Sequence, residues 1–296
     1  MKNSRALTGG FIYWCVQFVK CPFARAVSKY LLKAFRKLNR KIRVNKMKKF
    51  AILPFIVVLN LFATTVFAQQ ILYKTMDGWQ TMDAKDWPQN NRQNKPRSAK
   101  QVNNITRTIT YLDVNNNTGV GFDDAADGAN RRATFEAAVD YTLGVLGNNG
   151  KVDIEVQLSQ TDGSGALATG GTLYFVQPGF SAGMAFTHIT TGVDPFASVP
   201  DITVTVDFGH NYNTGLGDPA AGQSDLFSVI VHEVTHGLGI TSLANANGTS
   251  AIGGGYSVFD QFLQRSPNSN LFDSSGNFIG SSADLTSNQV VFNGGN

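Results

Sequence analysis

Two stretches of the chain alternate apolar and polar residues, so that each presents its apolar side chains on one face of an extended backbone. The alternating apolar residues are Val152, Ile154, Val156 and Leu158 in residues 152–158, and Ile202, Val204, Val206 and Phe208 in residues 202–208. This period of two predicts half-buried strands. Shorter strands are predicted from Ile105 to Tyr111 and over the sequence TLYFV at 172–176.

Apolar residues recur every three or four positions elsewhere, which is the period of an amphipathic helix. In residues 129–146 these positions are Phe135, Val139, Leu143 and Leu146, and the sequence NNG at 148–150 ends the pattern. A second helix is predicted to begin near Ser224, a good N-cap residue, with Asp225 in its first turn. The order strand, helix, strands, helix predicts an α+β fold in which a twisted mixed sheet packs on two helices.

Basic residues are concentrated at the start of the chain. Residues 1–68 hold 14 of the 25 lysines and arginines and none of the 21 acidic residues. Residues 47–68 begin with Met47 and two lysines, continue as an apolar run and end at the small residue Ala68. These features predict a Sec-type signal peptide, cleavage near Ala68, and a secreted or cell-surface protein. The alternative is a membrane-anchoring helix, although Pro54 and Asn60 interrupt the run.

Residues 1–46 precede the predicted signal peptide, which normally begins a chain. We interpret them as a non-native upstream extension that results from a misplaced start codon. The alternative is a basic amphipathic segment that binds anionic membranes, because lysines and arginines recur along it.

The remainder of the chain is acidic. Residues 69–296 carry 11 basic and 21 acidic residues, a net charge of −10, and no cysteine. We therefore expect no nucleic-acid partner and no disulfide, and we expect no membrane association of the mature domain. Residues 69–103 are polar and rich in Asn, Gln and Lys, which predicts a linker or loosely packed N-terminal arm before a domain at 104–296.

The acidic and asparagine-rich loops are compatible with Ca²⁺, but none of them makes a specific case. The loop that starts at Asp113 also contains Asn115 and Asn117, yet Thr118 stands where an EF-hand requires glycine. A solvated turn is therefore the preferred interpretation of this loop.

The helix predicted after Ser224 contains the sequence HEVTH at 232–236. Histidines four residues apart lie on one face of a helix, where two imidazoles can bind one tetrahedral Zn²⁺. Glu233 can then face a metal-bound water and act as its general base. His232 and His236 are thus the predicted metal ligands and Glu233 the predicted catalytic residue. Two ordinary histidines on an amphipathic helix are the alternative, which would leave costly polar groups on a buried helix.

The sequence HEVTHGLG resembles the zinc-binding helix of the zincin metallopeptidases, and its HGLG ending is most similar to the metzincins. Residues 105–293 also resemble a group of secreted bacterial proteins regarded as metallopeptidases, in which a segment such as SVFDQFL follows the zinc helix. The resemblance implies a zincin-like fold with a third zinc ligand after the helix. The metzincin pattern HExxHxxGxxH places that ligand at Ser242, which is a poor zinc ligand, and no methionine follows the helix to form a Met-turn.

The third ligand therefore has to come from elsewhere, and Asp260 is the candidate. It lies in SVFDQFL, where a lone carboxylate among apolar residues needs a partner such as a metal. One alternative is a capping or hydrogen-bonding role for Asp260. Others are ligation by His188 or His210, or by a residue beyond 296, since the chain stops at VVFNGGN without a clear closing element and is interpreted as a candidate C-terminal truncation.

Together these features predict a secreted zinc-dependent endopeptidase with one catalytic Zn²⁺ and a polypeptide substrate. The ion lowers the pKa of its water toward 7, Glu233 takes the proton, and the hydroxide attacks a peptide carbonyl. Zincin architecture implies that the strand at 202–208 is the sheet edge along which an extended substrate pairs. The alternative function is a non-catalytic zincin-like module for surface binding or adhesion that holds a structural metal.

Overall fold

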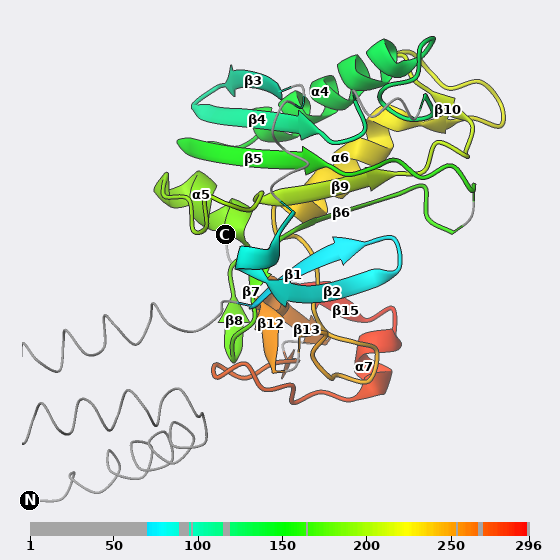
Figure 1. Cartoon of the computed structure of the whole chain (residues 1–296). Coiled ribbons are helices and arrows are strands. Elements are labelled where there is room, and N and C mark those ends of the chain that lie inside the picture. The colour runs from blue at the N-terminus through cyan, green and yellow to red at the C-terminus, as the bar shows by residue number, and fades with distance from the viewer. Residues whose placement is uncertain are drawn as a thin grey trace, which may run out of the picture. The chain divides into compact units, whose positions relative to one another are not determined.

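A computed structural model of the chain describes residues 70–88, 95, 97–114, 119–163, 165–252, 254–265 and 269–294. The chain divides into two units, Met1–Phe67 and Ala68–Asn296, and every described residue belongs to the second. The predicted extension at 1–46 and the predicted signal peptide at 47–68 lie outside the described residues. None of the described helices is long and apolar enough to cross a membrane. The described part is a mixed α+β structure with four α-helices and several sheets (Figure 1).

The largest sheet has five strands in the order β3-β4-β5-β9-β6. These strands span Arg97–Val102 (β3), Ile105–Tyr111 (β4), Gly150–Val156 (β5), Ala168–Thr172 (β6) and Ile202–Val206 (β9). β4, β5 and β9 run parallel, whereas β3 and β6 are antiparallel to their neighbours at the two edges. The strands predicted from Ile105, at 152–158 and at 202–208 are therefore present as β4, β5 and β9.

The expectation that residues 202–208 form the edge of the sheet is wrong. β9 lies between β5 and β6, and all five of its residues are buried. The edge strand is β6, and no described strand pairs with its outer side. The sequence of β6, ATGGT, lacks alternating large apolar residues, so the period of two does not reveal it.

Two helices cover the same face of this sheet (Figure 1). α4 spans Gly128–Gly144 and α6 spans Leu226–Gly237. The side chains of Phe135, Val139 and Leu143 on α4 and of Leu226, Ile230 and Val234 on α6 are fully buried in the core. Each such side chain contributes roughly 1.5–3 kcal/mol relative to an exposed position. The predicted stripe of α4 is confirmed, and the core fixes α6 against the sheet.

A buried arginine joins β4 to α4. Arg107 is 1% exposed, and its guanidinium lies 2.9 Å from Asp140 Oδ1 and 3.1 Å from Glu136 Oε2. It also donates a hydrogen bond to the carbonyl oxygen of Ser98 at 2.9 Å. Because a buried charge is costly without such partners, this network fixes the position of α4 along the sheet.

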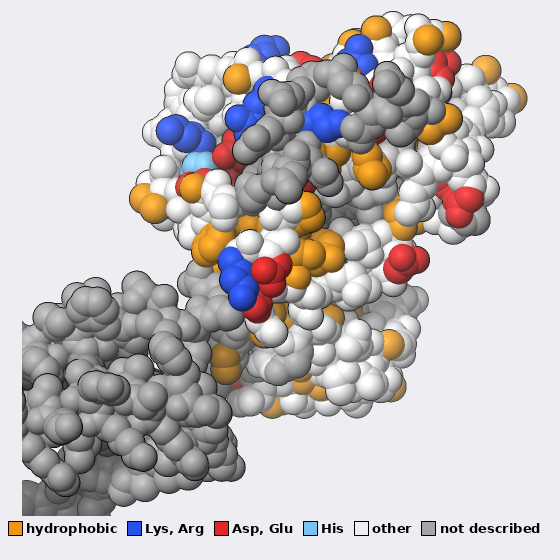
Figure 2. Space-filling view, viewed as in Figure 1, with side chains coloured by type: hydrophobic (Ala, Val, Ile, Leu, Met, Phe, Trp, Pro, Cys, Tyr) orange, Lys and Arg blue, Asp and Glu red, His pale blue; other side chains and the backbone are white. Residues whose placement is uncertain are grey.

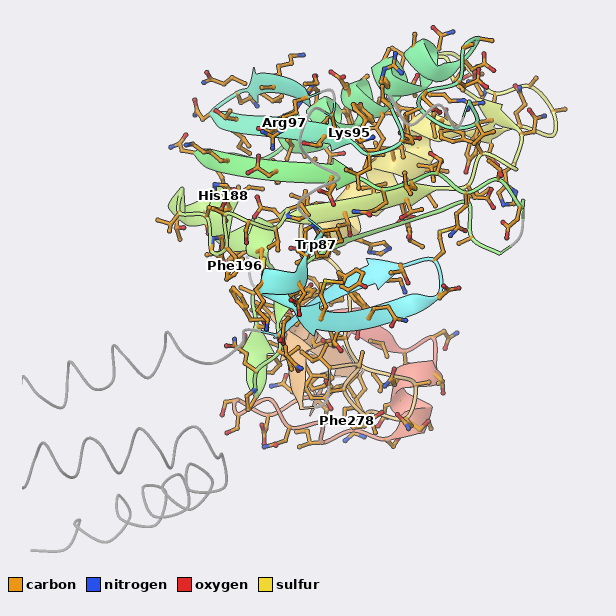
Figure 3. All side chains as sticks on the ribbon, viewed as in Figure 1. Trp87, Lys95, Arg97, His188, Phe196 and Phe278 are labelled. Carbon is orange, nitrogen blue, oxygen red and sulfur yellow. The ribbon has the colours of Figure 1, made fainter. Side chains whose placement is uncertain are left out.

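The described part of residues 69–103 is not a loosely packed arm. It contains β1 (Gln70–Thr75), β2 (Gly78–Asp83), the 3-10 helix η1 (Ala84–Asp86) and β3. β1 pairs with β2 and also with β7 (Tyr174–Phe175). Ile71 and Leu72 are fully buried, and Trp87, labelled in Figure 3, is 4% exposed. These few apolar anchors hold the segment although most of its side chains are polar and face solvent.

Smaller elements follow α6 and surround a separate apolar cluster. They are β12 (Gly255–Ser257), η2 (Asp260–Phe262), β13 (Leu263–Arg265), β14 (Ser269–Asn270), α7 (Ser282–Thr286) and β15 (Val290–Phe292). The buried members of the cluster are Tyr256, Leu263, Leu271 and Phe272. β12 pairs in parallel with β8 (Gly179–Ser181), which precedes α5 (Met184–Thr191). This pairing ties the C-terminal elements to the centre of the chain.

Candidate metal centre

The start of α6 is fixed by Asp225. Its Oδ2 atom accepts a hydrogen bond from the backbone N–H of Ser228 at 3.1 Å, which is the geometry of an N-cap. The predicted cap residue, Ser224, instead lies in β11 (Ser224–Asp225), which pairs with β10 (Tyr212–Asn213). The cap prediction was therefore wrong by one residue, because serine and aspartate are both good caps and only the backbone pairing distinguishes them.

The two predicted metal-binding histidines converge on the side of α6 that is not packed in the core. The Nε2 atoms of His232 and His236 lie 3.0 Å apart, and their ring planes are 84° apart. A tetrahedral Zn²⁺ with bonds of about 2.0–2.1 Å holds two ligand nitrogens about 3.3 Å apart. The pair can therefore hold one such ion with little movement of either ring.

A backbone carbonyl orients the second imidazole. The Nδ1 atom of His236 lies 2.8 Å from the carbonyl oxygen of Ile240. Because a carbonyl oxygen only accepts, Nδ1 carries the hydrogen and Nε2 keeps its lone pair for a ligand. The chain turns back to make this contact at Gly239, whose φ of +96° lies in the region that favours glycine. The predicted turn at Gly239 is thus confirmed, and it also prepares His236.

Glu233 occupies the buried side of the helix beside the histidines and is 8% exposed. Its carboxylate accepts a hydrogen bond from the backbone N–H of Gly170 in β6. Burial raises the pKa of Glu233 to about 7, although the Gly170 hydrogen bond and the charge of Lys74 act in the opposite direction. A carboxyl group with a pKa near neutrality can both accept and return a proton.

Two glycines let α6 approach the sheet closely. A Cβ atom at Gly170 would lie 2.6 Å from the carbonyl oxygen of Glu233 and 2.7 Å from its Cβ. A Cβ atom at Gly237 would lie 2.6 Å from Cγ2 of Ile202 in β9. Any larger residue would push the helix away, so these glycines place the carboxyl group of Glu233 directly beside the edge strand.

The third predicted ligand, Asp260, does not join the histidine pair. It is fully buried, and its Oδ2 atom accepts hydrogen bonds from the backbone N–H groups of Leu243 at 3.0 Å and Ser257 at 2.8 Å. The hydroxyl of Ser242 donates to Oδ1. Asp260 therefore ties the loop after α6 to β12, which is the hydrogen-bonding alternative. Its carboxylate already has enough partners without a metal.

The remaining histidines lie in other parts of the fold. His188 on α5 is hydrogen-bonded through Nδ1 to Asp201 Oδ2 at 2.7 Å, and His210 Nε2 lies 3.7 Å from Asp207 Oδ2. Among the described residues, one group of three potential His, Cys, Asp or Glu ligands has all its ligand atoms within 4.8 Å of one another, and it comprises Asp153, His188 and Asp194. The described residues thus provide two side-chain ligands at the HEVTH helix, and the third predicted one is elsewhere.

Asp113 also has a structural role. Its Oδ2 atom accepts hydrogen bonds from the backbone N–H of Phe122 at 2.8 Å and from the hydroxyl of Ser159 at 2.7 Å. The carboxylate thereby anchors the loop that precedes α4. Asn115 and Asn117, the other residues weighed for a calcium loop, lie outside the described residues.

The residues of the HEVTH helix can bind a metal through two converging imidazoles, and Glu233 can transfer a proton beside them. Comparisons of the chain with protein-family models, with curated proteins and with solved structures find no match.

Proposed function

We propose that this chain is a secreted zinc-dependent endopeptidase with a zincin-like fold, in which His232 and His236 bind the ion and Glu233 is the general base. The observation that carries the proposal is the convergence of the two Nε2 atoms, 3.0 Å apart, on the helix that also holds a buried carboxyl group. The mixed sheet with an antiparallel edge strand beside that helix supports it.

A zinc ion bound by this pair would supply Lewis acidity, which lowers the pKa of water and polarises a carbonyl group. The chain's own contribution is proton transfer. Glu233 accepts a proton from the attacking water and then gives it to the nitrogen of the leaving amine. With a pKa raised to about 7 by burial, the carboxyl group is suited to both steps near neutral pH.

The edge strand β6 provides a place for a polypeptide substrate. One side of β6 pairs with β9, and no described strand pairs with the other. An extended peptide can add to such an edge through backbone hydrogen bonds, which recognise main chain rather than particular side chains. Since Gly170 of β6 contacts Glu233 directly, a peptide on this edge would run past the carboxyl group.

The test is to replace Glu233 by Gln in the full chain. The amide keeps an oxygen for the Gly170 N–H but cannot act as a base, so cleavage of a casein-type substrate should fall by a factor of about 10²–10⁴. Zinc content, measured by elemental analysis, should stay equal to that of the parent. In contrast, His232→Ala should lose zinc and activity together.

Asp218→Asn is the matched control, because it also replaces a carboxylate by an amide but lies in an exposed loop. It should retain both zinc and cleavage. Full activity of Glu233→Gln would contradict the proposed mechanism. Stoichiometric zinc in the parent without turnover of any peptide substrate would instead identify the non-catalytic binding module.

A further inference from the structure

A second group of potential metal ligands lies where α5 packs against the main sheet. Asp153 comes from β5, His188 from α5, and Asp194 from the turn that follows α5. Their ligand atoms all lie within 4.8 Å of one another. Two ligands of one ion with bonds of about 2.1 Å lie at most about 4.2 Å apart, so small side-chain rotations bring the three around an ion. Figure 3 labels His188 at this position.

The imidazole of His188 is already oriented for ligation. It is 3% exposed, and its Nδ1 atom lies 2.7 Å from Oδ2 of Asp201. Asp201 is itself fixed, since the same Oδ2 atom accepts a hydrogen bond from the backbone N–H of Asp153 at 2.8 Å. Metal-binding histidines usually donate their other ring N–H to a carboxylate in this way. The Nε2 atom is therefore the one left to bind an ion, and no described residue hydrogen-bonds to it.

The two ligand carboxylates have oxygens to spare. Asp194 Oδ1 accepts a hydrogen bond from the backbone N–H of Phe196 at 2.8 Å, which leaves its second oxygen free of described partners. No described residue donates a hydrogen bond to the carboxylate of Asp153. α5 ends at Gly192, whose φ of +71° reverses the chain. This turn returns Asp194 to the side of His188.

The charge around His188 is strongly negative. Burial lowers its pKa, but the hydrogen bond to Asp201 and the charges of Asp201, Asp194 and Asp153 more than offset this, so its pKa is raised. In Figure 2, histidine atoms reach the surface beside acidic side chains at the place where Figure 3 labels His188. Either a proton on the imidazole or a cation from solvent can balance this charge.

We propose that Asp153, His188 and Asp194 bind a divalent transition-metal ion of the Zn²⁺ class, at a site that contains neither His232 nor His236. An imidazole nitrogen with two carboxylates is a donor set that suits such ions, whereas Ca²⁺ and Mg²⁺ prefer oxygen ligands throughout. The ion would connect β5 to α5 and to the turn after it. Its role would therefore be to hold this corner of the sheet together.

The experiment removes the first site and titrates the second. The full-length His232→Ala/His236→Ala variant, freed of metal by a chelator, should bind one Zn²⁺ in a calorimetric titration, and Ca²⁺ or Mg²⁺ should not compete. Adding Asp194→Asn should weaken zinc binding at least about tenfold. This is a conservative change, because the asparagine oxygen can still accept the Phe196 N–H. Asp218→Asn in the same background is the control and should bind zinc like its parent.

The parent chain gives a second measurement that does not depend on folding of the double variant. It should bind two zinc ions, and Asp194→Asn should bind one. A chain that binds a single ion lost on Asp194→Asn would contradict the proposed catalytic site but support this second site. Unchanged zinc binding after Asp194→Asn in both backgrounds, or no zinc binding by the folded double variant, would overturn the inference and identify His188 as a protonated partner of its carboxylates.

Discussion

Replacing Glu233 by Gln should change how the stability of the metal-free protein depends on pH. Burial raises the pKa of Glu233 to about 7, whereas its ordinary value is 4.5. Between these values the folded protein keeps a proton that the unfolded chain has released. The free energy of unfolding of the parent therefore contains a favourable contribution below pH 4.5 that is lost as the pH rises through 7. Glutamine stays neutral and lacks this loss.

The size of the effect follows from the two pKa values. Their difference of about 2.5 corresponds to about 3 kcal/mol at about 1.4 kcal/mol per unit. Because Glu233 is 8% exposed, solvent screens little of this effect. The variant should therefore gain about 3 kcal/mol relative to the parent between about pH 4 and pH 8, with most of the change between pH 4.5 and 7.

Urea unfolding at a series of pH values measures this difference, with a chelator present to keep both proteins metal-free. Other buried carboxyl groups with raised pKa values, such as Asp113 and Asp201, affect both proteins equally and cancel. Asp218→Asn should follow the parent curve at every pH. A difference between parent and Glu233→Gln that stays constant from pH 4 to pH 8 would refute the assignment of a buried, near-neutral carboxyl group.

Three further substitutions test the structure around the site. Gly170→Ala should cost about 1–3 kcal/mol in urea unfolding and reduce peptide cleavage, because the new methyl group collides with the backbone of Glu233; unchanged values would contradict the close approach of β6 and α6. Arg107→Ala should cost about 3 kcal/mol, since it leaves the two carboxylates of α4 without their buried partner, and calorimetric melting would reveal it. Asp260→Asn should lower stability by about 2 kcal/mol, because the amide cannot replace both carboxylate oxygens, yet leave zinc content unchanged; loss of zinc without loss of stability would restore Asp260 as a ligand.

The sequence predicts the parts of this fold that have a strict period. The stripe of α4 and the alternation in β5 and β9 describe surfaces that pack on one core, so local sequence is enough to locate them. The geometry of the HEVTH helix is also local, because a spacing of four residues brings His232 and His236 together in any regular helix.

What the sequence does not predict depends on residues that are distant along the chain. The hairpin of β1 and β2 is mostly polar and is held by Ile71 and Leu72, whose partners lie about a hundred residues later. An isolated Asp260 suits a metal ligand and a loop anchor equally well, and only the position of Ser257 and the neighbouring backbone decides between them. Similarly, no pattern relates Asp153 to His188, because their proximity arises from the packing of α5 on β5.

The burial of β1 decides how far this protein can be shortened. Ile71 packs with Leu173 and Met184, and Leu72 packs with Tyr174 and with Leu243 in the loop after α6. Truncation to residue 104, the boundary that composition suggests, would strip these side chains of their cover and expose an adhesive apolar surface. A recombinant fragment intended to stay monodisperse should therefore start no later than Gln70.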